Sequence, residues 1–125
     1  MFKINKEDQS VNLTRGDACV IGLKSIDADG NAYTFRQGEV IRLSVYGKKD
    51  CDNVVLQKDY PITADSEEIA LFISSEETKF GKIINKPTDY WYEVELNPGP
   101  YSQTLIGYDN NGPKLFRIYP EGEKL

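Results

Sequence analysis

The sequence contains no histidine among its 125 residues. Histidine is the general base of Ser-His-Asp and Cys-His nucleophilic sites, so both kinds of hydrolytic machinery are excluded. Only two cysteines are present, which also excludes a four-ligand structural zinc site built from cysteine and histidine. Any catalysis would have to use carboxylates, lysine or tyrosine. We expect a protein that is not an enzyme and that holds no cofactor and no metal ion.

Long apolar runs are also missing. The first ten residues, MFKINKEDQS, lack the apolar region of a secretory signal. No apolar stretch of the chain approaches the length that spans a bilayer. Cys19 lies in an apolar run and Cys51 in the charged stretch KKDCDN, so we expect free thiols and a reducing compartment. The chain is expected to be made in the cytoplasm without membrane insertion, although a secreted domain whose signal had been removed would look the same.

Basic charge is in deficit. The net charge is -5 and the pI is near 4.8, which opposes the phosphate neutralisation that nucleic-acid binding requires. Lysine and arginine are scattered along the chain rather than grouped, so nucleic acid is not an expected partner. The length is about that of one domain, and we expect a single domain over residues 1–125.

Alternation of apolar and polar residues predicts an all-β protein. The predicted strands are 19–23, 40–46, 53–58, 69–73, 90–96, 103–108 and 115–119. Between them, DADGN, RQGE, NPGP and DNNGP carry the residues that turns require. Short strands at this spacing are typical of a sandwich or small barrel. Ser74 followed by Glu77 matches a capping box and predicts one short helical turn near 74–80.

The strand YWYEVELN has two different faces. Tyr90, Tyr92, Val94 and Leu96 share the face expected to be core. Trp91 shares the other face with Glu93 and Glu95, which a sandwich cannot bury unpaired, so that face should meet water. Trp91 is then either sheltered by a neighbouring loop or exposed as a contact residue.

Two acidic patterns bear on possible chemistry. In SIDADGNAYTFR, Ser25, Asp27 and Asp29 match the first ligands of a calcium loop, but Arg36 stands where a bidentate glutamate is required. A hairpin turn with Gly30 or Asn31 at positive φ is the preferred interpretation. Glu93 and Glu95 have a spacing from which a glycosidase pair could be built, but on a solvent-facing strand a charged outer face is the better interpretation.

The tripeptide Arg15-Gly16-Asp17 would suggest an integrin ligand in an extracellular protein. Integrin recognition needs the arginine and the aspartate at the tip of an exposed loop, whereas Asp17 leads directly into the predicted strand 19–23. We expect Gly16 to supply a turn and Asp17 to hydrogen-bond nearby backbone amides, so that the motif serves the backbone rather than adhesion.

The ordered features resemble the immunoglobulin-like N-terminal domain of phage and prophage baseplate or tail proteins of Gram-positive bacteria, typified by upper baseplate proteins. The segments that carry the resemblance are LTRGDACVIGLKSIDADGNAYTFRQGEVIRLSV, QKDYP, IALFISSEETKF, DYWYEVEL and SQTLIGYDNNGPKLFRI. The chain departs from the family in a longer stretch between Phe80 and Tyr90. The resemblance implies an immunoglobulin-like β-sandwich of about seven to nine antiparallel strands, with one short helical turn, in a virion tail assembled in the host cytoplasm.

The same resemblance implies a non-catalytic assembly role through contacts with other tail or baseplate proteins, and in some cases through self-association. If 40–46 and 90–96 are antiparallel neighbours, Arg42 lies across from Glu93 or Glu95, and Tyr46 lies near Trp91. These five residues form the candidate interface, an aromatic patch with a charged rim. The alternative is a carbohydrate-binding or adhesive module of a bacterial cell surface, in which Trp91 and Tyr46 stack on glycan rings.

Overall fold

The computed structural model describes residues 2–4, 7–82, 85–110 and 112–121. These residues form strands and loops, and no helix occurs among them. The nine strands are β1 (Phe2–Ile4), β2 (Val11–Thr14), β3 (Cys19–Leu23), β4 (Val40–Tyr46), β5 (Val54–Pro61), β6 (Ile69–Ile73), β7 (Thr88–Leu96), β8 (Gln103–Ile106) and β9 (Lys114–Tyr119). The described part of the chain contains no helix that is long and apolar enough to span a membrane.

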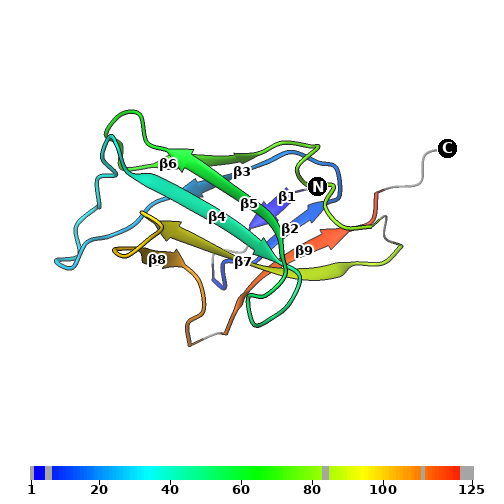
Figure 1. Cartoon of the computed structure of the whole chain (residues 1–125). Coiled ribbons are helices and arrows are strands. Elements are labelled where there is room, and N and C mark those ends of the chain that lie inside the picture. Colours follow the sequence, from blue (N-terminus) through cyan, green and yellow to red (C-terminus); the bar gives the residue numbers. More distant parts are fainter. Residues whose placement is uncertain (1, 5–6, 83–84, 111, 122–125) are drawn as a thin grey trace.

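The strands form two sheets, which lie one above the other in Figure 1. The larger sheet has the order β1-β2-β9-β7-β4-β5, and the smaller sheet consists of β3 and β6. β2 runs parallel to β9, while the other neighbouring strands are antiparallel. β8 and β9 both pair with β7, β8 near its Leu96 end and β9 near its Thr88 end. They therefore act together as one interrupted neighbour of β7.

Alternation along the strands places one apolar set from each sheet in a shared core. On β4 this set is Ile41, Leu43 and Val45, and on β7 it is Tyr92, Val94 and Leu96. The smaller sheet contributes Ile21 and Leu71, among others, to the same cluster of buried side chains. The all-β fold predicted from the periodicity is therefore confirmed, and of the two predicted architectures, sandwich and small barrel, the two sheets are consistent with the sandwich.

Three predicted strands, 19–23, 40–46 and 69–73, have the predicted bounds. The strand expected at 53–58 is 54–61, and the one expected at 103–108 ends at Ile106 because the chain turns out into a loop at Gly107. β7 and β9 each begin slightly earlier than predicted. β1 and β2 were not predicted, since each is too short to show a convincing alternation.

The helical turn predicted near 74–80 is not confirmed as a helix. Its capping box is present, because the Ser74 amide donates to Glu77 Oε1 at 2.9 Å and the Glu77 amide donates to Ser74 Oγ at 3.3 Å. The segment then forms hydrogen-bonded turns instead of continuing, with the Thr78 amide donating to the Ser74 carbonyl. The Thr78 side chain is fully buried, so it fixes the end of this turn to the body of the protein.

Arg15-Gly16-Asp17 is where the chain leaves the larger sheet at β2 and crosses to β3. Gly16 has a φ of 87°, which confirms the turn predicted for it, and its amide donates to Thr78 Oγ1 at 3.1 Å. The Thr78 hydroxyl faces the Asp17 and Ser75 carbonyls at 2.9 and 3.0 Å. The Arg15 guanidinium donates to the Lys79 carbonyl and to Glu121, and its side chain is only 12% exposed. This arginine holds loops together and is not displayed for an adhesion receptor.

Replacing Thr78 with valine keeps the side-chain shape and removes the hydroxyl. The Gly16 amide then loses its partner, so we expect the free energy of unfolding to fall by about 1 to 3 kcal/mol. Urea denaturation followed by Trp91 fluorescence measures it. Thr88→Val is the matched control, since the hydroxyl of the half-buried Thr88 bonds, among the described residues, only to the nearby Lys86 carbonyl. Equal losses in the two variants would show that Thr78 is not the anchor of the crossing.

Candidate functional site

The pairing of β4 with β7 creates the candidate site. Arg42 lies across from Glu95, Ser44 from Glu93, and Tyr46 from Trp91. The two strands are therefore antiparallel neighbours, as predicted, and all five candidate residues share the outer face of the larger sheet. This face points away from β3 and β6.

An apolar row crosses this outer face from strand to strand. Trp91 pairs with Leu115 of β9 on one side and with Tyr46 of β4 on the other, and Tyr46 pairs with Val54 of β5. We call Val54, Tyr46, Trp91 and Leu115 the apolar row. Val54 is 52% exposed, Tyr46 only 9%, and Trp91 and Leu115 are half-buried. Trp91 is thus neither fully sheltered nor freely displayed.

Ion pairs flank the apolar row on both sides. Arg42 of β4 holds Asp59 of β5 in a two-pronged contact, with Nε to Oδ1 at 2.8 Å and the second nitrogen to Oδ2 at 3.1 Å. Beyond the other side of the row, Arg117 of β9 holds Asp89 of β7 in the same way at 2.6 and 3.2 Å. The hydrogen bond that Asp59 accepts from Arg42 lowers the pKa of Asp59, and the hydrogen bond that Arg117 donates to Asp89 raises the pKa of Arg117. Both pairs are partly exposed, so they contribute little to stability and remain accessible to a partner.

Arg42 was expected to face Glu93 or Glu95. In register it does lie across from Glu95, but its guanidinium turns to Asp59 on the neighbouring strand. Asp59, Asp89, Arg117 and Leu115 were not predicted as site residues. Alternation in 54–61 places Asp59 on the outer face, but only the strand order brings it beside Arg42.

Glu93 connects the apolar row to the charged part of the face. The Tyr46 hydroxyl donates to Glu93 Oε1 at 2.8 Å. Burial, followed by this hydrogen bond, raises the pKa of Tyr46 to about 12. Cys51, in the hairpin between β4 and β5, also lies close enough for the Glu93 charge to raise its pKa, after the larger effect of burial. The prediction of free thiols agrees with the structure, in which neither cysteine forms a disulfide.

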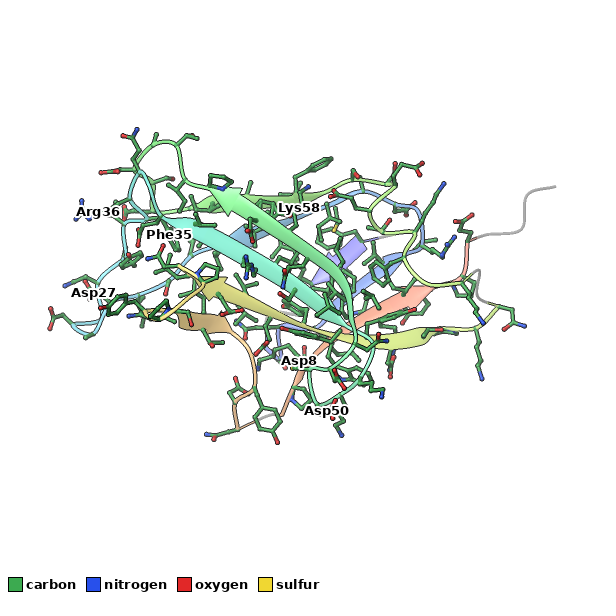
Figure 2. The ribbon with its side chains drawn as sticks, viewed as in Figure 1. Asp8, Asp27, Phe35, Arg36, Asp50 and Lys58 are labelled. Carbon is green, nitrogen blue, oxygen red and sulfur yellow. The ribbon has the colours of Figure 1, made fainter. Side chains whose placement is uncertain are left out.

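Two loops project on the same side of the larger sheet. The hairpin between β4 and β5 and the loop between β8 and β9 both extend away from β3 and β6, toward the bottom of Figure 1. Figure 2 shows Asp50 in that hairpin, on the opposite side of the larger sheet from Lys58. The second loop is held by Lys114, whose side chain is 3% exposed and whose Nζ lies 2.6 Å from Asp109 Oδ2. Both loops therefore stand beside the outer face, close to the part of β7 that carries Trp91.

The segment SIDADGNAYTFR forms the predicted hairpin. Gly30 has a φ of 85°, and Asp27 Oδ1 accepts from the amides of Asp29 and Asn31 at 2.9 and 3.0 Å. The carboxylate is thus used to close the turn. In the described ranges, no group of three or more Cys, Asp or Glu side chains is placed to hold a metal ion.

A pocket of about 260 Å³ lies beside this hairpin. Ile26, Tyr33, Leu96 and Leu105 supply its apolar lining, and Gln103 supplies a polar group. It sits at the Leu96 end of β7, away from Trp91. Glu93 and Glu95 do not line it, so it does not support a carboxylate-based active site built from them.

The raised pKa of Tyr46 can be tested by removing the charge of Glu93. In Glu93→Gln we expect the pKa of Tyr46 to fall from about 12 toward its ordinary value near 10, because the acceptor is no longer an anion. The pKa is measured by NMR of tyrosine labelled at Cζ. Since the folded-state pKa is raised, neutral Tyr46 stabilises the fold below about pH 10, and this contribution is lost between about pH 10 and about pH 12.

Glu95→Gln is the matched control, because it removes the same charge from the same face of the same strand. It should leave the pKa of Tyr46 nearly unchanged, since Glu95 lies across from Arg42 rather than Tyr46. A Tyr46 pKa that stays near 12 in Glu93→Gln would assign the whole shift to burial.

Known proteins offer no independent guide to this face. Comparison of the chain with protein-family models, with curated proteins and with solved structures finds no match. The resemblance to phage and prophage tail domains therefore stays a prediction.

Proposed function

We propose that this chain is a non-catalytic assembly domain that binds another protein through the outer face of its larger sheet. The observation that carries the proposal is the apolar row with an arginine-carboxylate pair on each side. Protein interfaces commonly have an aromatic centre, arginine among the enriched residues, and a polar rim. Trp91 is the central residue of this arrangement.

The charges of the face indicate the chemistry of the partner. Arg42 and Arg117 are already matched by Asp59 and Asp89, which leaves the carboxylates of Glu93 and Glu95 in excess. A second copy of the same face would set these carboxylates against each other, which costs free energy. A different protein that presents lysine or arginine fits better, since a guanidinium could pair with Glu95 and lie over the Trp91 ring.

The extent of the face shows which parts must take part. The face spans four strands that lie about 4.8 Å apart, and successive residues on the same face of a strand are about 7 Å apart. These spacings give a patch of roughly 15 by 20 Å. This is smaller than the roughly 800 Å² that each partner buries in a stable complex. The hairpin between β4 and β5 and the loop between β8 and β9 would have to supply the remaining contact, and both project on this side.

The sheet order supports an immunoglobulin-like type. The neighbours β9-β7-β4 in the larger sheet correspond to strands G-F-C of that fold, and β3-β6 corresponds to B-E. With the sequence resemblance, this favours a tail or baseplate domain of a phage or prophage, with other tail proteins as partners. The carbohydrate-binding alternative is weaker, because Tyr46 is only 9% exposed and its ring has little surface for a sugar.

The proposal is tested by coexpressing the chain with the products of the genes that flank its own and measuring complex formation by size-exclusion chromatography. Trp91→Ala should weaken a complex about thirtyfold, since a central interface tryptophan contributes about 2 kcal/mol or more. Tyr101→Ala is the matched control, because Tyr101 is an aromatic residue 89% exposed in a loop outside the face. Urea denaturation should show both variants folded.

Two results would contradict the proposal. One is a complex that Trp91→Ala leaves intact, which would move the contact to another surface. The other is glycan-array binding that is lost in Trp91→Ala, which would favour the carbohydrate-binding alternative. A Trp91→Ala variant that unfolds would show that Trp91 is needed by the core, and Glu95→Arg, which reverses a charge on the outer face, would then test the same contact.

A further inference from the structure

The smaller sheet has two outer edges, and the described residues cover only one of them. At the β6 edge, the Phe72 carbonyl accepts hydrogen bonds from Lys58 Nζ at 2.8 Å and from the Tyr60 hydroxyl at 2.7 Å. Lys58 also lies over the Phe72 ring, 5.5 Å from its centroid. Side chains of β5 therefore bridge from the larger sheet to β6 and occupy its edge.

The β3 edge is open by comparison. Because the Phe72 carbonyl points away from β3, the Val20–Phe72 pair makes no hydrogen bonds between its strands. The backbone groups of Val20 and Gly22 consequently face outward from the sheet. Of the residues that the structure describes, none makes a hydrogen bond to these outward groups. Val20 is 46% exposed, and Gly22 is also exposed.

β3 also lacks the features that usually keep edge strands from pairing. Its sequence, CVIGL, has no charge and no proline, and its register with β6 is continuous. By contrast β5, at one edge of the larger sheet, has Lys58, Asp59 and Pro61, and a register shift where it begins. Edge strands protected by charge, proline or a register shift, as β5 is, are the rule in soluble proteins. Glycine inside a strand, such as Gly22 of β3, often marks a close approach by another backbone.

We propose that β3 pairs edge to edge with β3 of a second copy of this chain, in antiparallel orientation about Ile21. This inference concerns a different surface and does not depend on the role of Trp91. Antiparallel pairing joins residues whose backbone groups both face outward, so Val20 of each copy lies across from Gly22 of the other. Each valine side chain then lies over a glycine, and the exposed Glu68 side chain, whose Oε1 is 3.3 Å from where a Cβ on Gly22 would stand, moves aside. The two smaller sheets merge into one with the order β6-β3-β3-β6.

The distribution of charge near β3 is compatible with a second copy of this chain at its edge. The chain as a whole carries a net charge of -5, but residues 18–23 contain no charged side chain. Asp17 precedes the strand and Lys24 follows it, so antiparallel pairing brings Asp17 of each copy near Lys24 of the other. Lys24 also contacts Glu68 of its own chain, at 3.7 Å in an exposed pair that leaves its ammonium accessible. Val20 and Phe72 add apolar surface on the outer side of the merged sheet.

The contact between the two β3 strands, which we call the seam, is short, and the dimer is therefore expected to be weak. The two Val20–Gly22 pairs supply about four main-chain hydrogen bonds and bury less area than a stable dimer needs. We expect dissociation constants on the order of 100 μM for the isolated protein. In a multimeric assembly the local concentration reaches the millimolar range, where such a contact forms.

Two measurements on the wild-type protein test the proposal. Sedimentation equilibrium over about a hundredfold range of concentration should show a monomer-dimer equilibrium. Amide hydrogen exchange by NMR should show that Val20 and Gly22 become protected as concentration rises. The amides of Cys19, Ile21 and Leu23 point toward β6 and should be protected at every concentration, which makes them internal references.

Variants then locate the seam. Val20→Lys places a charge on each side of it and should weaken the dimer at least tenfold, whereas Ala70→Lys adds the same charge to the same outer face on β6 and should leave the dimer unchanged. Trp91→Ala should also leave it unchanged, and this result separates the β3 contact from the proposed partner-binding face. If Val20→Lys does not fold, the wild-type exchange data decide.

Three outcomes would overturn the inference. The first is a monomer at all concentrations with Val20 and Gly22 unprotected. The second is a dimer that Trp91→Ala abolishes and Val20→Lys does not. The third is protection of these amides only when a different protein is added, which would assign the edge to a strand donated by that protein.

Discussion

The antiparallel register of β4 with β7 determines both faces of the larger sheet at once. With Leu43 across from Val94, the inner face is continuous with the core, and with Tyr46 across from Trp91, the outer face acquires its apolar row. Side chains alternate along a strand, so a slip of one residue would send the aromatic residues inward and the core residues into water. The free energy of burying the inner face therefore also sets the arrangement of the outer face.

The smaller sheet is the less complete layer. With only β3 and β6, it covers the larger sheet over a narrow strip, and β5 compensates with polar side chains that reach across. Lys58 lies across from the core residue Leu43, yet its Nζ bonds to the Phe72 carbonyl and to Glu77 Oε1, both at 2.8 Å. This closes the β6 side. On the β3 side no comparable bridge is made among the described residues, and that asymmetry is why the two edges differ in their capacity to pair.

The two proposed surfaces suit an assembly domain because they differ in chemistry. The outer face of the larger sheet is aromatic and acidic, which selects a cationic partner and opposes self-pairing. The β3 edge is uncharged and offers backbone groups, which accept any extended strand and in particular its own copy. One surface thus favours contacts with a different protein and the other favours contacts with the same protein, and they lie on opposite sides of the sandwich.

Much of the molecule follows from local sequence. Alternation predicted the strands 19–23, 40–46 and 69–73, and residue type predicted the turns at Gly16 and Gly30, because side-chain period and positive φ are local properties. Other features depend on neighbours that are distant in sequence. The partner of Arg42 is Asp59 because β5 lies beside β4, and Arg15 is enclosed because Lys79 and Glu121 meet it at the crossing. The parallel pairing of β2 with β9 and the open edge of β3 belong to the same class, since strand order is decided by packing and not by the residues of any one strand.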